Sequence, residues 1–336
     1  LPSFMNDEIK DRLSQSIASV ISIENSDIIL KCVRQLLVND GDGQVFFLKD
    51  HWVRILTIMT IELEPRMLLD FYSKFEFSTW IEVFEGIRNH WSLSEQENNN
   101  VRDTIQSFLL ANIKCDWSNH TCLIRFIFNK DVVEIKKMQE ALKVNRIFNF
   151  FHMTDLSNLS NILDRGLLSH HNAHKDRLVQ KDISMSEVQD RRDAVHTFVP
   201  FYFNVRNPMM YLRKDEDSVI VLQFSSSLYL LADEFTDGNA GSNNTNRFST
   251  SNIENFSQLN WNKIRARYWN SDDKFEYWEN KRMIMAELLV QNRVSMLLCE
   301  SIICRRYSQK VLIEKCLGDW SSHISVSVNP DLFFVQ

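Results

Sequence analysis

The hydrophobic pattern of this chain changes after Arg146, and the change divides the sequence into two regions of different structural class. Before that point, apolar residues recur at the spacing of amphipathic helices. The first such stripe is formed by Ile9, Leu13, Ile17 and Val20. After that point, short aromatic and β-branched runs dominate. We therefore predict an all-α accessory domain of unknown role over residues 1–145 and a second domain over residues 146–336.

The second region mixes predicted strands with predicted helices. The runs typical of strands are Phe148–Phe151, Thr197–Phe203, Ser218–Phe224 and Ile324–Val328. Between them, Leu156–Asp164 and Lys281–Val290 are interpreted as helices. Because strands and helices do not alternate with the regular spacing of βαβ units, we predict an α+β fold with a largely antiparallel sheet.

Composition excludes several classes of protein. The formal net charge of −6 argues against a broad basic face that grips long duplex DNA, although it permits a local basic groove. No apolar run approaches the roughly 20 residues that span a bilayer. The six cysteines have no framework spacing, and Cys115, His120 and Cys122 form no standard zinc knuckle. We expect a reduced, cytoplasmic protein without a membrane segment.

The run from Phe150 to Gly166 joins a strand to a helix. Alternate residues of a strand point the same way, so His152 and Thr154 share one face. Thr154 or Asp155 can cap the following helix, and Gly166 suits its C-terminal turn. A histidine at a strand end is more often structural than functional, so this run alone does not identify a site.

Two later segments carry polar groups that suit ligand binding. The pair Arg191–Arg192 is ordinarily a solvated feature, yet the planar arginine fork also holds a pyrophosphate or aligns a carboxylate. The aromatic strand 199–203 is ordinarily core but can form a wall on which a ligand ring stacks. The turn from Glu234 to Gly241 predicts glycines at positive φ, and a surface turn is its ordinary interpretation.

Glu287 lies in an apolar run, where an unpaired carboxylate would be costly. It is therefore either capped by a partner or faces a cleft with a chemical role. None of these segments identifies a function alone, but their order and spacing along the chain do indicate one.

Read in order, these segments resemble the DarT family of toxin ADP-ribosyltransferases, which act on nucleic-acid bases. The resemblance covers about residues 147–336 and does not include the N-terminal domain. The matched positions are His152, Thr154, Asn158, Leu159, Ile162, Leu163, Gly166, Leu167, Val199–Phe203, Pro208–Met210, Phe235–Ala240, Leu259, Trp261, Ile264 and Ala286–Val290.

The resemblance implies an ADP-ribosyltransferase fold, a split antiparallel sheet that binds NAD as co-substrate in a central cleft and needs no metal. It implies catalytic roles for Glu287 and Arg192, with Arg191 as an adjacent alternative. The cofactor-binding residues it implies are His152, Met153 through its backbone, Thr154, Asn161, Arg192 and Tyr202.

The segment from about Asn246 to Lys281 corresponds to the family's target-recognition loop. Aromatic and basic residues alternate there, as in a stacking platform with phosphate contacts, and an amphipathic helix over the cleft is the equal alternative. The expected substrate-binding residues are Asn239, Arg247, Trp261, Arg265, Arg267 and Trp269. Many relatives carry His where this chain has Asn239, which cannot titrate near neutral pH.

The resemblance also predicts a mechanism and a setting. Loss of nicotinamide leaves an oxocarbenium-like charge that the carboxylate of Glu287 can stabilise. A reachable acceptor base must be single-stranded or flipped, so we expect single-stranded DNA as the acceptor. RNA is the alternative, followed by protein modification and a non-catalytic binding module. The implied setting is a bacterial toxin–antitoxin or phage-defence system with an antitoxin protein as partner.

Three clustered histidines, His170, His171 and His174, raise the question of a metal site. The sequence offers no fixed fourth ligand, so a polar loop beside the cleft is the favoured interpretation.

Overall fold

The computed structural model describes Gln106, residues 132–183 and residues 195–334. The predicted N-terminal helices, the cysteines before residue 132 and the pair Arg191–Arg192 lie outside these residues. Contacts divide the chain into two units, Leu1–Asn129 and Lys130–Gln336, and the second unit is described below. Its first helix, α8 (Val132–Val144), precedes the change in sequence pattern and packs against the 3₁₀ helices η4 (Ser226–Leu231) and η5 (Ile253–Gln258).

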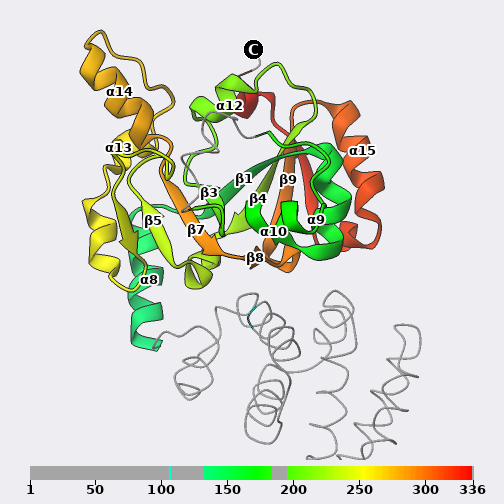
Figure 1. Ribbon diagram of the computed structural model, residues 1–336, viewed down its shortest axis with the longest axis horizontal. Coiled ribbons are helices and arrows are strands. Elements are labelled where there is room, and N and C mark those ends of the chain that lie inside the picture. The colour runs from blue at the N-terminus through cyan, green and yellow to red at the C-terminus, as the bar shows by residue number, and fades with distance from the viewer. Residues whose placement is uncertain (1–105, 107–131, 184–194, 335–336) are drawn as a thin grey trace, which may run out of the picture. The chain divides into compact units, whose positions relative to one another are not determined.

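The second unit is built on an eight-stranded sheet with the order β10-β9-β4-β1-β3-β7-β5-β6 (Figure 1). Neighbouring strands are antiparallel except for β10 and β9, which are parallel. The α+β prediction with a largely antiparallel sheet is thereby confirmed. The strands are β1 (Asn149–Asp155), β3 (Phe198–Tyr202), β4 (Val219–Ser225), β5 (Glu234–Thr236), β6 (Arg247–Ser249), β7 (Glu287–Gln291), β9 (Cys299–Cys304) and β10 (Ser325–Val328), with a separate antiparallel pair β2 (Leu167–Leu168) and β8 (Arg293–Val294).

The sheet is split between β1 and β3. These strands pair at one position, Phe151 with Tyr202, whereas β1 and β4 pair at seven. Pro200 lies within β3 and has no N–H to donate to a ladder. Its carbonyl oxygen instead lies 2.8 Å from Nδ1 of His152. Because a carbonyl only accepts, Nδ1 must carry the proton, and a side chain takes the place of a ladder hydrogen bond.

Short helices follow β1, and further helices flank the two ends of the sheet. The η2 turn (Leu156–Asn158) begins where Asp155 accepts a hydrogen bond from the Ser157 N–H, and α9 (Leu159–Arg165) ends at Gly166 with φ +81°. The sequence predicts both caps.

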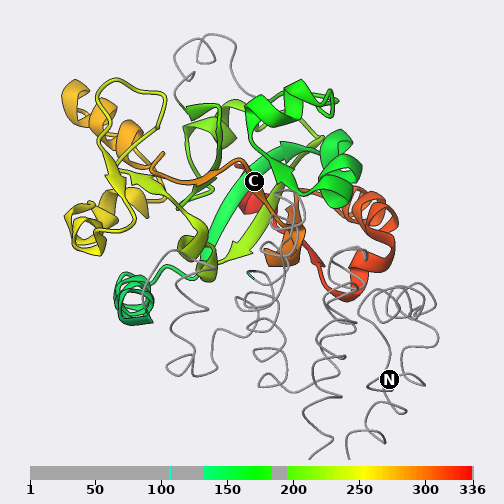
Figure 2. The same cartoon turned by 60° about the horizontal axis from the view of Figure 1, so that its bottom comes forward.

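In Figures 1 and 2, α13 (Trp261–Ile264) and α14 (Lys274–Met283) lie beyond β5, and α15 (Tyr307–Leu317) lies beside β9 and β10 at the opposite end. The remaining elements are α10 (His170–Lys175), α12 (Pro208–Leu212), η6 (Met296–Leu298), η7 (Gly318–Ser322) and η8 (Pro330–Phe333). No described helix is long and apolar enough to cross a membrane.

One predicted element is wrong. Residues 281–290 were interpreted as a helix, but α14 ends at Met283 and β7 begins at Glu287. Strand β7 lies between β3 and β5, and its residues Glu287–Val290 are all buried. A strand buried on both faces gives a continuous apolar run, which cannot be distinguished from a buried helix by periodicity.

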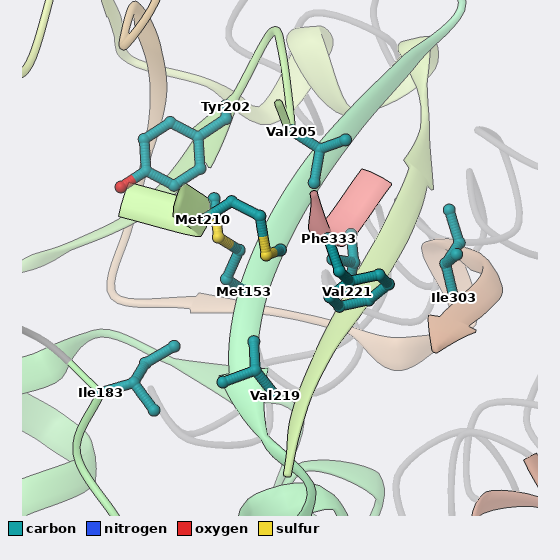
Figure 3. Packing of buried hydrophobic residues seen from close by; sticks show 9 residues of the cluster. All are labelled: Met153, Ile183, Tyr202, Val205, Met210, Val219, Val221, Ile303 and Phe333. Carbon is teal, nitrogen blue, oxygen red and sulfur yellow. The ribbon is translucent and has the colours of Figure 1, made fainter. Parts of the chain in front are cut away.

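The two faces of β1 belong to different parts of the core. Phe151 and Met153 face an apolar cluster that joins β1, β3 and β4 to the C-terminal η8 (Figure 3). The cluster members are Met153, Ile183, Tyr202, Val205, Met210, Val219, Val221, Ile303 and Phe333. On the opposite face, Phe150 packs against Phe203 with ring centroids 5.4 Å apart. Burial of each such side chain contributes about 1.5–3 kcal/mol, which fixes both halves of the split sheet.

Candidate active site

A cavity of about 610 Å³ opens where the sheet is split. This volume lies within the usual range of small-molecule sites. Strands β1, β3 and β7 form its wall, because the cross-strand pairs of Tyr202 with Glu287 and Pro200 with Leu289 turn these four side chains to one face. The predicted site residues that line this cavity are His152, Met153, Thr154, Asn161, Tyr202, Asn239, Trp269 and Glu287.

Glu287 combines complete burial with a position on the cavity wall. Its exposed fraction is 0%, and its Oε2 accepts a hydrogen bond of 2.7 Å from the backbone N–H of Ala240. Its own N–H donates to Oγ1 of Thr236 at 3.0 Å. A charge-assisted bond to a backbone N–H stabilises a carboxylate that burial would otherwise penalise. The sequence predicts either a partner that caps this carboxylate or a position facing a cleft, and in the structure Glu287 has both.

The turn that holds Glu287 is itself held by α14. Nη1 of Arg282 donates to Oδ1 of Asp237 at 2.7 Å, and the hydroxyl of Thr236 donates to the carbonyl of Gly238 at 2.6 Å. Burial opposes the charge of Arg282, but hydrogen bonds from its guanidinium to Glu279 and the nearby charge of Asp237 outweigh it and raise its pKa. Through Asp237 and the turn, Arg282 thus supports the backbone N–H of Ala240 that binds Glu287.

Gly238 is required for a reason that the sequence did not reveal. A Cβ there would lie 2.8 Å from both Cγ and Nη1 of Arg282. The predicted positive φ in this turn is wrong, because Gly166 and Gly318 are the described glycines with positive φ. The constraint is the close approach of the Arg282 side chain rather than backbone handedness.

His152 is poised as a neutral hydrogen-bond acceptor. Burial lowers the pKa of its imidazole, which outweighs the opposing effect of its hydrogen bond to the Pro200 carbonyl. Since Nδ1–H donates to that carbonyl, the neutral ring keeps its lone pair on Nε2. The ring packs 5.8 Å from that of Phe201, which fixes its plane.

Two asparagines of the first motif hold the opposite wall. Nδ2 of Asn158 donates to the carbonyl of Lys181 at 2.8 Å, and Nδ2 of Asn161 donates to that of Leu178 at 2.6 Å. Lys181 also bridges the carboxylates of Asp155 and Glu216, at 2.9 Å from each. The side-chain amide of Asn161 is thus engaged in positioning the loop at residues 178–181.

Of the six predicted substrate-binding residues, Asn239 and Trp269 line the cavity, and the other four lie in the core or at the surface. Trp261 packs between Phe203 and Phe256, with ring centroids 5.3 and 4.6 Å away, and Trp269 lines the cavity next to Tyr211. The three arginines bind protein groups outside the cavity lining. Arg247 pairs with Glu234, Arg265 donates to the carbonyl of Asn145, and Arg267 pairs with Asp331.

Sequence reasoning did not assign roles to Thr236, Ala240 or Arg282. The adjacent pair Lys281–Arg282 was visible, but no spacing connects Arg282 to Asp237, which lies 45 residues earlier. Thr236 and Ala240 lie in the matched run Phe235–Ala240, but Ala240 acts through its backbone N–H, so its side chain does not reveal this role.

Comparison with known proteins gives a family match over this same unit. The family model described as "ssDNA thymidine ADP-ribosyltransferase, DarT" matches residues 151–334. A protein of Thermus sp. (strain 2.9) named "DNA ADP-ribosyl transferase" is 30% identical over an alignment of 182 residues, and the match covers 48% of this chain and 82% of the relative. The family match confirms the resemblance and the ADP-ribosyltransferase fold predicted from the motifs.

Further similar proteins include a fusion and two solved structures. A "DNA ADP-ribosyl transferase-DNA ADP-ribosyl glycohydrolase fusion protein" of Thermosipho africanus (strain H17ap60334) is 25% identical over an alignment of 206 residues, and the match covers 56% of this chain and 50% of the fusion. Thermus sp. 2.9 DarT in complex with ADP-ribosylated ssDNA has a TM-score of 0.48 and 25% identity, covering 56% of this chain and 96% of that one. The same protein in complex with NAD⁺ has a TM-score of 0.45 and 24% identity, covering 55% and 96%.

Proposed function

This chain belongs to the DarT family, and we propose that it cleaves NAD and transfers the ADP-ribose to a thymidine base of single-stranded DNA. The observation that carries the proposal is Glu287, a fully buried carboxylate fixed by the Ala240 N–H on the wall of the cavity. The names of the relatives support DNA as the acceptor. The description of the family supports thymidine and a single strand.

NAD binds across the split of the sheet. The lone pair of His152 Nε2 suits a ribose hydroxyl. The next two residues of β1, Met153 and Thr154, also line the cavity and can offer the ligand a backbone group and a hydroxyl. The ring of Tyr202, beside Glu287 in the sheet, gives the nicotinamide an aromatic surface. Arg192 holds a phosphate oxygen or orients Glu287 in this scheme.

The reaction breaks the bond between the ribose anomeric carbon and the nicotinamide nitrogen. Nicotinamide leaves with the bonding electrons as a neutral molecule, and the ribose becomes an oxocarbenium-like cation beside the Glu287 carboxylate. The thymine imide nitrogen then attacks the anomeric carbon and loses its proton to Glu287 as general base. That nitrogen is paired inside a duplex, so the substrate is single-stranded.

The proposal extends to a setting and a partner. We place the protein in the bacterial cytoplasm as a toxin, in a toxin–antitoxin or phage-defence system. The described cysteines Cys299, Cys304 and Cys316 are free thiols, which suits a reducing compartment. The fused glycohydrolase of the Thermosipho relative supports an antitoxin partner for this chain that removes the modification.

The test is Glu287→Gln, assayed with labelled NAD and an oligonucleotide that contains thymidine. Loss of the charge should reduce transfer by about 10³-fold, the scale of a removed transition-state contact, while NAD binding changes little. Glu314→Gln on the outer face of α15 is the control and should retain transfer. Undiminished transfer by Glu287→Gln contradicts the catalytic assignment.

The acceptor is tested separately from the chemistry. Nucleoside mass spectrometry after parallel reactions with DNA, DNA without thymidine, and RNA identifies polymer and base. Label on thymidine of single-stranded DNA is the expected result. Equal labelling of RNA or of the protein itself would contradict thymidine of single-stranded DNA as the acceptor, but not NAD as the donor of ADP-ribose.

A further inference from the structure

Three side chains that line the cavity, those of His170, His174 and Asp182, lie close together. In the sequence they are more than 100 residues before Glu287. His170 and His174 lie one turn apart on α10, and Asp182 follows on the loop held by Asn158. Nε2 of His170 is 3.1 Å from Oδ2 of Asp182, and Nε2 of His174 is 3.4 Å from the same oxygen. The three ligand atoms lie within 4.8 Å of one another.

These separations match metal coordination. Tetrahedral bonds of about 2.0–2.2 Å from one ion to nitrogen and oxygen place neighbouring ligand atoms roughly 3.3–3.5 Å apart. Both distances to Asp182 Oδ2 are close to this spacing. The ligand atoms can therefore surround an ion with small side-chain adjustments.

The surroundings hold the histidines in place. The ring of His196 stacks on that of His170 with centroids 4.4 Å apart and planes at 26°. The His196 carbonyl accepts the backbone N–H of His171 at 2.9 Å, which fixes the first turn of α10. The start of α10 is capped by Ser169, whose backbone N–H donates to the Asn292 carbonyl at 2.7 Å. Ligands fixed by packing in this way lose little freedom on binding an ion.

We propose that His170, His174 and Asp182 form a binding site for a divalent transition metal, with Zn²⁺ as the best fit. Two imidazoles and one carboxylate are a zinc ligand set that leaves the fourth position to water, whereas Mg²⁺ and Ca²⁺ prefer oxygen ligands. The side chains are partly exposed, so an ion reaches them from solvent. None of the three acts in the transfer reaction proposed above.

Part of this cluster was visible in the sequence. The three neighbouring histidines lacked a further ligand, and His171 was grouped with the other two. In the structure the third member of the cluster is Asp182 and not His171, because the loop after α10 brings Asp182 to the other two histidines.

The test is metal binding by the full chain after treatment with a chelator. Titration with ZnCl₂ by calorimetry should show one saturable site, and Co²⁺ should give the visible absorption of a tetrahedral ion. His174→Ala and Asp182→Asn should each weaken Zn²⁺ binding at least about tenfold. His171→Ala, on the same helix but outside the cluster, should bind as the wild type does, and MgCl₂ should give no saturable signal.

Thermal unfolding gives a second readout. Zn²⁺ should raise the Tm of the wild type and of His171→Ala, and should leave that of Asp182→Asn unchanged. Asp182→Asn preserves the size of the side chain, which separates loss of a ligand from loss of the fold. Absence of a saturable site in the wild type, or an equal loss in His171→Ala, overturns the proposal.

Discussion

Two regions border the cavity, and they differ in how their side chains are fixed. Glu287 and Phe201 on the central strands are 0% exposed. The arm, which we define as α13, α14 and the residues between them (261–283), is anchored by the buried rings of Trp261 and Trp269, but on α14 Phe275 is 78% and Trp278 is 54% exposed. Groups that act on a reacting bond must be held in one geometry, whereas groups that meet a flexible strand must be reachable. The strands therefore suit the proposed NAD chemistry, and the exposed part of the arm suits the proposed contact with nucleic acid.

The largest contrast between the regions is expected in stability. Phe201→Ala removes a ring packed 5.0 Å from that of Phe224 in the core, and should lower the free energy of unfolding by about 3–5 kcal/mol. Trp278→Ala on the arm should lower it by less than about 1 kcal/mol. Urea unfolding followed by circular dichroism measures both. Equal losses would show that the arm is part of the core.

The next effect concerns the contact between the regions. Arg282→Ala on α14 removes the support of the turn that holds Glu287, and should lower kcat by about 10–100-fold with little change in the KM for NAD. It should also lower the free energy of unfolding by about 1–3 kcal/mol, since Asp237 loses its charged partner and keeps only its hydrogen bonds from Asn246. Arg282→Lys should restore part of kcat because it returns the charge.

The matched control for that variant is Arg305→Ala. Arg305 is 2% exposed and pairs with Asp217 at the far end of the sheet. Its loss should lower stability by a similar amount and leave kcat within about twofold. If both variants lose kcat in proportion to stability, Arg282 has no positioning role.

A smaller effect is expected from pH, and it concerns the strand region alone. Burial lowers the pKa of His152 in the folded protein. Between that value and the ordinary value near 6.5, the unfolded chain binds a proton that the folded chain does not. Stability should therefore fall as pH drops below about 6.5, by at most about 1.4 kcal/mol per pH unit from this group. Urea midpoints from pH 7.5 to 5.5 should fall less steeply in His152→Gln, and parallel lines would contradict the assignment.

The smallest effect concerns the arm's charges. Arg267 is exposed and pairs with Asp331, so its guanidinium can exchange that partner for a phosphate. Arg267→Ala should weaken single-stranded DNA binding a few-fold and reduce the slope of log affinity against log salt by about one. Fluorescence anisotropy at several salt concentrations measures it. Lys310→Ala on α15 is the control, and an unchanged slope in Arg267→Ala would remove Arg267 from the DNA path.

The sequence predicted the strand region better than the arm, for physical reasons. Strands β1, β3, β4 and β10 were predicted from local aromatic and β-branched runs, and Glu287 from its place in an ordered series of motifs. Strand β7 was misread because both of its faces are buried. The pairing of Arg282 with Asp237 and the approach of Asp182 to His170 depend on loops that bring distant residues together, and no local pattern encodes them.

The split between β1 and β3 has a consequence for solubility. An unpaired strand edge is normally a hazard, because its free backbone groups can recruit a strand from another chain. Here an edge of that kind lies in the middle of the sheet and opens into a cavity rather than onto the surface. The gap that leaves room for the proposed ligand lies between inner strands, so it adds no further outer edge to the sheet at which another chain could pair.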